Sequence, residues 1–339
     1  MKRIIGLVLL AVLLLAACAT TDDVSDDGAP LRVITTIFPQ FDFVRQIAGD
    51  RVELSMLISP GAESHGFEPT PRDMVALSRT DLFIYVGGHG DTWVYPILAS
   101  LDIEDMRTVA LVDLVDTVHH HHHDHHHDHD HCDLDHDCEY DHDDCDPDEG
   151  YCAIDHHHGH HHDDHHDDHV WTCPRNAILI VEALAEILSE LDPDNADFFR
   201  ANATAYIADL QALDQALAEV VARGVRSTVI FGDRFPFRYL TDTHGLTVYA
   251  AFEGCSAETQ ASPATIAFLI EKVQAENIPV VFYIEFSTRL IANVIAEATG
   301  ARLLELHSVH NVSHADFSAG VTYLDLMRRN VEQLREALN

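Results

Sequence analysis

Two long stretches of this chain alternate short apolar runs with amphipathic segments. In the first stretch, the runs LRVITT, VELSMLI, DLFIYVG and TVALV predict buried strands, and the segments between them predict short helices. The second stretch begins near residue 225. Its expected strands are 227–232, 247–252, 279–285 and 302–306, and its expected helices are 236–245, 262–277, 288–299 and 315–337. Strands that alternate with helices are typical of a parallel sheet covered on both faces, so the pattern predicts two Rossmann-like α/β lobes.

One long amphipathic segment, residues 193–224, lies between these stretches. Asp192 and Pro193 are a helix-start signal and Gly224 is a stop signal. The apolar positions recur at steps of three and four residues: Phe199, Tyr206, Leu210, Leu213, Leu217 and Val220. About thirty residues at 1.5 Å each would span roughly 45 Å, so we expect a rigid helix that joins the lobes. The cleft between the lobes is then the expected ligand site.

The domain organisation follows from these patterns. We expect an N-terminal lobe over 31–192, the linking helix over 193–224 and a C-terminal lobe over 225–339. Residues 119–168 interrupt the first lobe and follow neither periodicity, so they are predicted to be a disordered insertion.

The first thirty residues are typical of an exported protein. Lys2 and Arg3 precede a short apolar run that ends in the small-residue sequence LAAC. This sequence resembles a lipoprotein cleavage box and implies a signal peptide over 1–17, lipidation of Cys18 and a flexible tether over 18–30. We expect an extracytoplasmic protein anchored to the cell membrane by lipid. An ordinary secretory signal with a buried Cys18 is the alternative.

Charge and histidine are concentrated in the insertion. The chain has a formal net charge of −37, and 18 acidic residues but no Lys or Arg lie between His119 and His169. Such a balance excludes nucleic acid as a partner and attracts cations. The histidines predicted to collect zinc weakly at several sites are His119, His120, His121, His122, His123, His125, His126, His127, His156, His157, His158, His160, His161 and His162. A sensing or buffering role and a tolerated insertion without function are the alternatives.

The cysteines leave their pairing open. Cys132, Cys138, Cys145 and Cys152 are spaced more loosely than the ligand pairs of zinc ribbons, and disulfides within the insertion are at least as well supported. Cys173 and Cys255 lie in separate ordered segments and are a candidate disulfide.

Ionisable residues follow several of the predicted strands, at the edge where open α/β sheets bind ligands. These candidate metal ligands are His65, Asp233, Glu285 and His307, together with His169 at the end of the insertion. Three imidazoles with a carboxylate or water suit tetrahedral zinc, whereas a site richer in carboxylates favours manganese. His310 is expected to support His307 or to replace it, and the histidines expected at the surface are His89, His244 and His314.

Several motifs give the chain a clear family resemblance. PGAESHGFEPTPRDM around His65 and DDHVWTCPRNA around His169 resemble the first two ligand motifs of zinc and manganese substrate-binding lipoproteins of ABC transporters. The linking-helix sequence and VFYIEFSTRLIANVIAEATGARLLEL resemble the same family, which thus covers nearly everything from residue 31. The zinc-binding branch also carries a His-rich insertion directly before its second ligand. The resemblance implies a monomeric protein that binds Zn²⁺ and delivers it to a membrane permease.

Two segments depart from the family pattern. GDRFPFRYL has no histidine where the third ligand of zinc members stands, which leaves Asp233 as the candidate, and His307 stands where an aspartate is common. Manganese or nickel binding within the same family is one alternative function, and a zinc-buffering or adhesion lipoprotein is another. A zinc hydrolase is disfavoured because HExxH, G-x-S-x-G and P-loop patterns are absent from the sequence.

Overall fold

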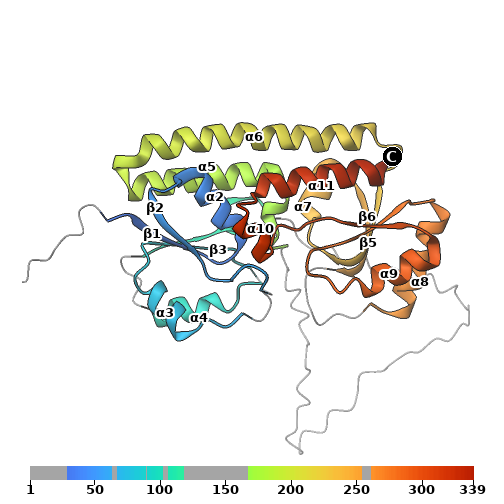
Figure 1. Cartoon of the computed structure of the whole chain (residues 1–339), viewed down its shortest axis with the longest axis horizontal. Helices are drawn as coiled ribbons and strands as arrows, with labels where there is room; N and C mark the ends of the chain where they lie inside the picture. Colours follow the sequence, from blue (N-terminus) through green and yellow to red (C-terminus); the bar gives the residue numbers. More distant parts are fainter. Residues whose placement is uncertain (1–28, 63–66, 89, 102–105, 118–166, 254–260) are drawn as a thin grey trace, which may run out of the picture.

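Two four-stranded parallel sheets lie side by side beneath a layer of long helices in the computed structural model of the chain (Figure 1). The structure describes residues 29–62, 67–88, 90–101, 106–117, 167–253 and 261–339. Each sheet is covered by helices on both faces, so the predicted α/β fold with two parallel sheets and a long joining helix is confirmed.

The N-terminal sheet has the strand order β2-β1-β3-β4, and every pairing is parallel. Its strands are β1 Leu31–Thr35, β2 Val52–Met56, β3 Leu82–Tyr85 and β4 Arg107–Ala110. Its helices are α2 Phe38–Ala48, α3 Pro71–Leu77 and α4 Val94–Ser100, and the 3₁₀ turn η1 Leu111–Leu114 follows β4. The hydrophobic residues of α3 and α4 cover one face of this sheet in a small separate cluster around Phe83.

The C-terminal sheet repeats this plan with the strand order β6-β5-β7-β8. Its strands are β5 Thr228–Phe235, β6 Thr247–Glu253, β7 Val280–Tyr283 and β8 Arg302–Glu305. Its helices are α7 Arg238–His244, α8 Pro263–Ala275, α9 Leu290–Thr299, α10 His314–Ser318 and α11 Tyr323–Leu338. Helices α8 and α9 cover the outer face with a cluster around Val281.

The joining helix is α6 Ala196–Arg223, preceded by the 3₁₀ turn η3 Pro193–Asn195. Its 28 residues correspond to about 42 Å at the α-helical rise, and Figure 1 shows it running above both sheets. Its buried residues include all six that its periodicity predicts, and they pack on α2, α11 and α5 Pro174–Leu191. One continuous core thus connects the inner faces of both sheets through the long helices.

The last predicted helix, 315–337, is in fact two helices. Helix α10 ends at Ser318, and α11 begins at Tyr323. Gly320 adopts φ 74°, a left-handed conformation that stops α10, and Thr322 caps α11 through a reciprocal pair of hydrogen bonds with Asp325.

Two strand boundaries change the placement of candidate ligands. Strand β5 continues to Phe235 with an irregular register between Phe231 and Arg234, so Asp233 lies within the strand and not after it. Strand β7 ends at Tyr283, so Glu285 lies two residues beyond its end.

Candidate metal centre

His169 is held in a fixed orientation where the chain re-enters the N-terminal lobe. It directly precedes the 3₁₀ turn η2 Val170–Thr172 and is 7% exposed. Asp167 Oδ1 lies 2.8 Å from His169 Nδ1 and 2.9 Å from the His169 backbone nitrogen. An ionised carboxylate only accepts hydrogen bonds, so Nδ1 carries the proton and Nε2 is the nitrogen with the lone pair.

The C-terminal lobe supports Asp167 in turn. The Tyr239 hydroxyl donates to the Asp167 carbonyl oxygen at 2.7 Å. The Arg238 Nε atom lies 4.0 Å from Asp167 Oδ2. The residue that orients His169 is therefore itself positioned by helix α7 of the other lobe.

Trp171 brings the second imidazole into place. Its buried indole Nε1 donates to the Ser308 carbonyl oxygen at 2.9 Å. The indole ring centroid lies 5.3 Å from the ring of His169 and 5.3 Å from that of His310. The two imidazole centroids are 5.9 Å apart, so one residue from each lobe faces the other beside a shared aromatic wall. That separation suits two imidazoles that coordinate one ion between them.

His307 lies in the same loop after β8 but does not join this pair. Its Nδ1 accepts the Val309 backbone N–H at 3.0 Å and lies 3.7 Å from Glu285 Oε1. A neutral imidazole that accepts at Nδ1 carries its proton at Nε2, so in this conformation neither nitrogen of His307 offers a free lone pair.

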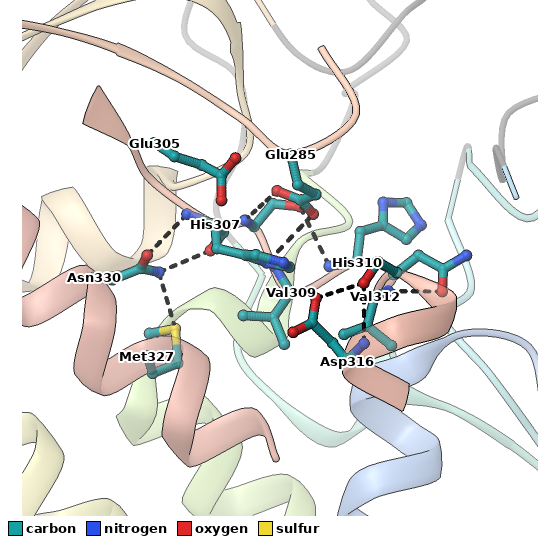
Figure 2. Close-up of polar contacts among 12 residues, drawn as sticks. Glu285, Glu305, His307, Val309, His310, Val312, Asp316, Met327 and Asn330 are labelled. Carbon is teal, nitrogen blue, oxygen red and sulfur yellow. Dashed lines mark hydrogen bonds and ion pairs between the residues drawn. The ribbon is translucent and has the colours of Figure 1, made fainter. Parts of the chain in front are cut away.

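Glu285 points at the backbone of that loop. It is 7% exposed, and its carboxylate accepts the Ser308 backbone N–H at 2.7 Å and a short hydrogen bond from the Ser308 hydroxyl. Figure 2 shows these contacts, with the His310 ring extending away from the carboxylate. Both carboxylate oxygens of Glu285 therefore accept hydrogen bonds from Ser308.

Asp233 is also engaged by backbone groups. It is 6% exposed, its Oδ1 accepts the Arg234 N–H at 2.8 Å, and its Oδ2 accepts the Ile284 N–H at 3.4 Å. These contacts join β5 to the end of β7. The described contacts do not bring Asp233 to His169 or His310.

His65 lies outside the described residues, but the segment that leads to it is anchored beside His310. Asn311 Nδ2 donates to the carbonyl oxygens of Ser59 and Ala62 at 2.9 Å each, and the Gly61 N–H donates to Val312 O at 2.7 Å. The residues that immediately precede 63–66 therefore lie against the loop that carries His310. Among the described residues, groups of three or more His, Cys, Asp or Glu side chains fit to hold a metal are absent.

The remaining predicted functional residues add no further contact to this site among the described residues. Cys18, Cys255, the insertion cysteines and the accessory histidines of the insertion lie outside the described residues. Cys173 is buried, and its sulfur lies 3.5 Å from Thr243 Oγ1, while its predicted partner Cys255 lies outside the described residues, so the bridge stays a prediction. His314 is exposed as expected, but the expectation for His244 is wrong, because its side chain is buried and paired with Asp214 at 3.3 Å. Burial lowers the pKa of His244.

Two aspartates, Asp168 and Asp91, hold the loop after β3 of the N-terminal lobe close to His169. The Gly90 N–H donates to Asp168 Oδ2 at 2.6 Å, and Asp91 Oδ2 accepts the N–H groups of Val86 and Gly87. Burial raises the pKa of Asp91 to about 6, and the backbone hydrogen bonds only partly offset that effect. The loop after β3 is thus tied to the residue next to His169.

Sequence reasoning missed most of the groups that build this site. Asp167 was one of many aspartates in the insertion, although its position two residues before His169 could have indicated a carboxylate that orients the ring. Trp171, Ser308 and Asn330 carry no metal-ligand signal in the sequence. The sequence predicts His310 as a support for His307 or as an alternative ligand to it, and not as a ligand in its own right.

The fold and the facing imidazoles define a class of protein: a two-lobed α/β binding protein with a candidate metal site where the lobes meet. Residues 33–337 match the family described as ZnuA, zinc-uptake complex component A, periplasmic. The chain belongs to this family. Membership confirms the predicted family resemblance.

Individual relatives agree with this assignment. The chain is 30% identical over 337 residues to the zinc-binding lipoprotein AdcA of Streptococcus pneumoniae serotype 4, which covers 99% of this chain and 61% of that relative. It is 28% identical over 348 residues to the high-affinity zinc uptake system protein ZnuA of Bacillus subtilis, covering 99% of this chain and 98% of that relative. The crystal structure of the Zn(II)-bound ZnuA-like domain of pneumococcal AdcA has a TM-score of 0.68 and 26% identity, covering 91% of this chain and 99% of that one.

None of the helices in the described part of the chain is both long and apolar enough to span a bilayer.

Proposed function

We propose that this chain captures Zn²⁺ outside the cytoplasmic membrane and delivers it to the permease of an ABC importer. The observation that carries the proposal is the juxtaposition of His169 and His310, with ring centroids 5.9 Å apart, in a chain of the zinc-uptake family. Asp167 fixes the His169 tautomer in which Nε2 is the coordinating nitrogen, and the anchored segment 59–62, which ends three residues before His65, lies against the loop that carries His310. Three imidazoles with a water or carboxylate are a typical zinc set.

Zinc is favoured over manganese by the donor chemistry. The two candidate carboxylates, Glu285 and Asp233, contact backbone N–H groups, and the described contacts do not bring them to His169 or His310, so the side chains that face each other there are imidazoles. Imidazole suits zinc, copper and nickel, whereas manganese prefers oxygen ligands. Manganese binding therefore requires an oxygen donor that the described contacts do not supply.

Small movements of the lobes fit this function better than wide closure. The lobes are tied directly next to the site, since the Phe38 N–H donates to His310 O at 3.3 Å and Asn311 reaches Ser59 and Ala62. Helix α6 also packs on elements of both lobes. Release to the permease would then proceed through a local change around the loop after β8, driven by the transporter.

The anchor and the insertion complete the proposal. Lipidation at Cys18 would hold a monomer next to its permease, and the relative AdcA of Streptococcus pneumoniae is itself a zinc-binding lipoprotein. The insertion histidines, which lead directly to Asp167 and His169, would collect zinc at low affinity and raise its concentration at the site.

The test is a competition titration with a zinc chelator on a soluble form that starts at residue 29. We expect one tight site in the starting protein, its loss in His169→Ala, and its retention in His314→Ala, a matched change at an exposed histidine. Manganese should compete only at large excess. Tight binding that persists in His169→Ala would contradict the proposal.

A further inference from the structure

The loop after β8 contains an unfavourable backbone conformation. Val309 adopts φ 61°, in the left-handed region that β-branched residues rarely enter. Such a conformation persists only where the surrounding structure fixes it, and it is concentrated at functional sites. The contacts that hold Val309 in this conformation therefore point to the function of the loop.

Glu285 fixes the residue directly before this turn. Its two carboxylate oxygens accept from the backbone N–H and from the hydroxyl of Ser308. The Ser308 hydroxyl oxygen in turn accepts the His310 backbone N–H at 3.3 Å. A chain of hydrogen bonds thus runs from the Glu285 carboxylate, through Ser308, to the backbone of His310 (Figure 2).

The remaining backbone groups of the loop are fixed from other elements. Asn330 on α11 accepts from the His307 N–H at 2.8 Å and donates to the His307 carbonyl oxygen at 2.7 Å. Trp171 donates to Ser308 O, and the Phe38 N–H donates to His310 O. Residues from α11, η2 and α2, together with Glu285, thus define one path for residues 307–310.

The turn decides which histidine faces the site. His307 Nδ1 accepts the Val309 N–H, and its ring stays within 3.7 Å of Glu285. Three residues on, the His310 ring lies against Trp171 and opposite His169. An extended conformation at Val309 would redirect the chain and take His310 away from that position.

We infer that Glu285 is a positioning residue, which clamps Ser308 to hold the strained turn at Val309 so that His310, and not His307, is presented to the metal ion. This inference rests on the proposed zinc-binding function. It assigns the loop imidazole to His310 and gives Glu285 a role outside the coordination sphere.

The first arm of the test compares the two histidines by chelator competition. We expect His310→Ala to weaken zinc binding at least 100-fold and His307→Ala less than 10-fold. The opposite order would overturn the assignment. If the unchanged protein itself lacks a tight zinc site, the proposed function fails, which is a separate result from a failure of this inference.

The second arm separates positioning from coordination at Glu285. We expect Glu285→Gln to weaken binding about 10- to 100-fold, because an amide cannot accept both hydrogen bonds from Ser308. Adding Val309→Gly should restore most of that affinity, because glycine adopts positive φ without strain and no longer needs the clamp. A lost metal ligand could not be recovered in this way.

A spectroscopic readout completes the comparison. The visible absorption of the Co²⁺-loaded double variant should match that of the Co²⁺-loaded starting protein, because Glu285 is not a ligand. Circular dichroism of the metal-free variants confirms that each is folded. Unchanged affinity in Glu285→Gln, or a loss that Val309→Gly does not restore together with a shifted cobalt spectrum, would overturn the inference.

Discussion

The Nδ1 atom of His169 lies 2.8 Å from Oδ1 of Asp167, and the same oxygen also accepts the His169 backbone N–H. One carboxylate oxygen therefore fixes both the backbone and the ring of the histidine at the centre of the site. In the proposed zinc site, the tautomer of His169 is therefore selected before the ion binds, which reduces the conformational freedom lost on binding.

Replacing Asp167 by Asn should weaken zinc binding about 10- to 100-fold, because the amide no longer stabilises the Nδ1–H tautomer through a charged acceptor. The measurement is the zinc dissociation constant by chelator competition. Asp194→Asn, at an exposed position in η3, is the matched control and should change nothing. Equal affinities for the two variants would remove Asp167 from the account.

Two buried tyrosines, Tyr323 and Tyr206, allow a matched test of a hydrogen bond beside the site. The Tyr323 hydroxyl donates to the Trp171 carbonyl oxygen at 2.7 Å, whereas the Tyr206 hydroxyl has no hydrogen-bond partner among the described residues. Tyr323→Phe should lower the free energy of unfolding by about 1–2 kcal/mol, because the Trp171 carbonyl loses its partner. Tyr206→Phe should leave stability unchanged or raise it slightly. Urea denaturation of the metal-free protein measures both, and a larger loss at Tyr206 would contradict the contact assignment.

Asp91 should make the protein less stable as the pH rises. Burial raises the pKa of its carboxyl to about 6, above an unfolded value of about 3.9. The folded state therefore binds more protons than the unfolded state between about pH 4 and pH 6, so this group's contribution to stability is lost as the pH rises through that window. The full effect is of the order of 3 kcal/mol.

Asp91→Asn isolates that contribution. An amide oxygen keeps the hydrogen bond from the Val86 N–H and does not titrate. The difference in unfolding free energy between the variant and the starting protein, both metal-free, should therefore grow in favour of the variant from pH 4 to pH 7. A difference that is flat across this range would show that Asp91 titrates normally.

Gly232 lets helix α9 approach β5 beside Asp233. A Cβ atom at Gly232 would lie 2.4 Å from the Cα of Ala292, a backbone atom that cannot move without the helix. Gly232→Ala should cost about 3 kcal/mol of stability through overpacking. Gly300→Ala meets no atom within 4 Å among the described residues and should cost only about 1 kcal/mol for its left-handed backbone. Thermal unfolding compares the two, and equal losses would refute the close approach.

The fold could be predicted from the sequence because strands and helices each produce a periodic pattern of apolar residues. Strand and helix patterns recur locally, and the six apolar positions of the linking helix are all buried on one face of α6. Gly320 and the capping pair of Thr322 and Asp325 are also local signals for the break between α10 and α11, but the prediction of a single helix over 315–337 did not use them.

The site could be predicted only in part, for a physical reason. His169 carries a recognisable motif, but His307 and His310 are three residues apart in one loop and have the same side chain. The backbone at Val309 decides which of them faces His169, and that conformation depends on hydrogen bonds from Glu285, Asn330 and Trp171, which come from distant segments. Composition and spacing contain no signal for such long-range contacts.

The most direct test of the central claim is a zinc titration against a competing chelator with and without the insertion. Residues 119–165 are replaced by a short Gly/Ser linker that keeps Asp167 and Asp168, and each form is measured with and without His169→Ala. We predict one tight site that survives removal of the insertion and is lost on His169→Ala. If tight binding instead disappears with the insertion and is indifferent to His169, the insertion is itself the receptor and the site between the lobes is not the zinc site.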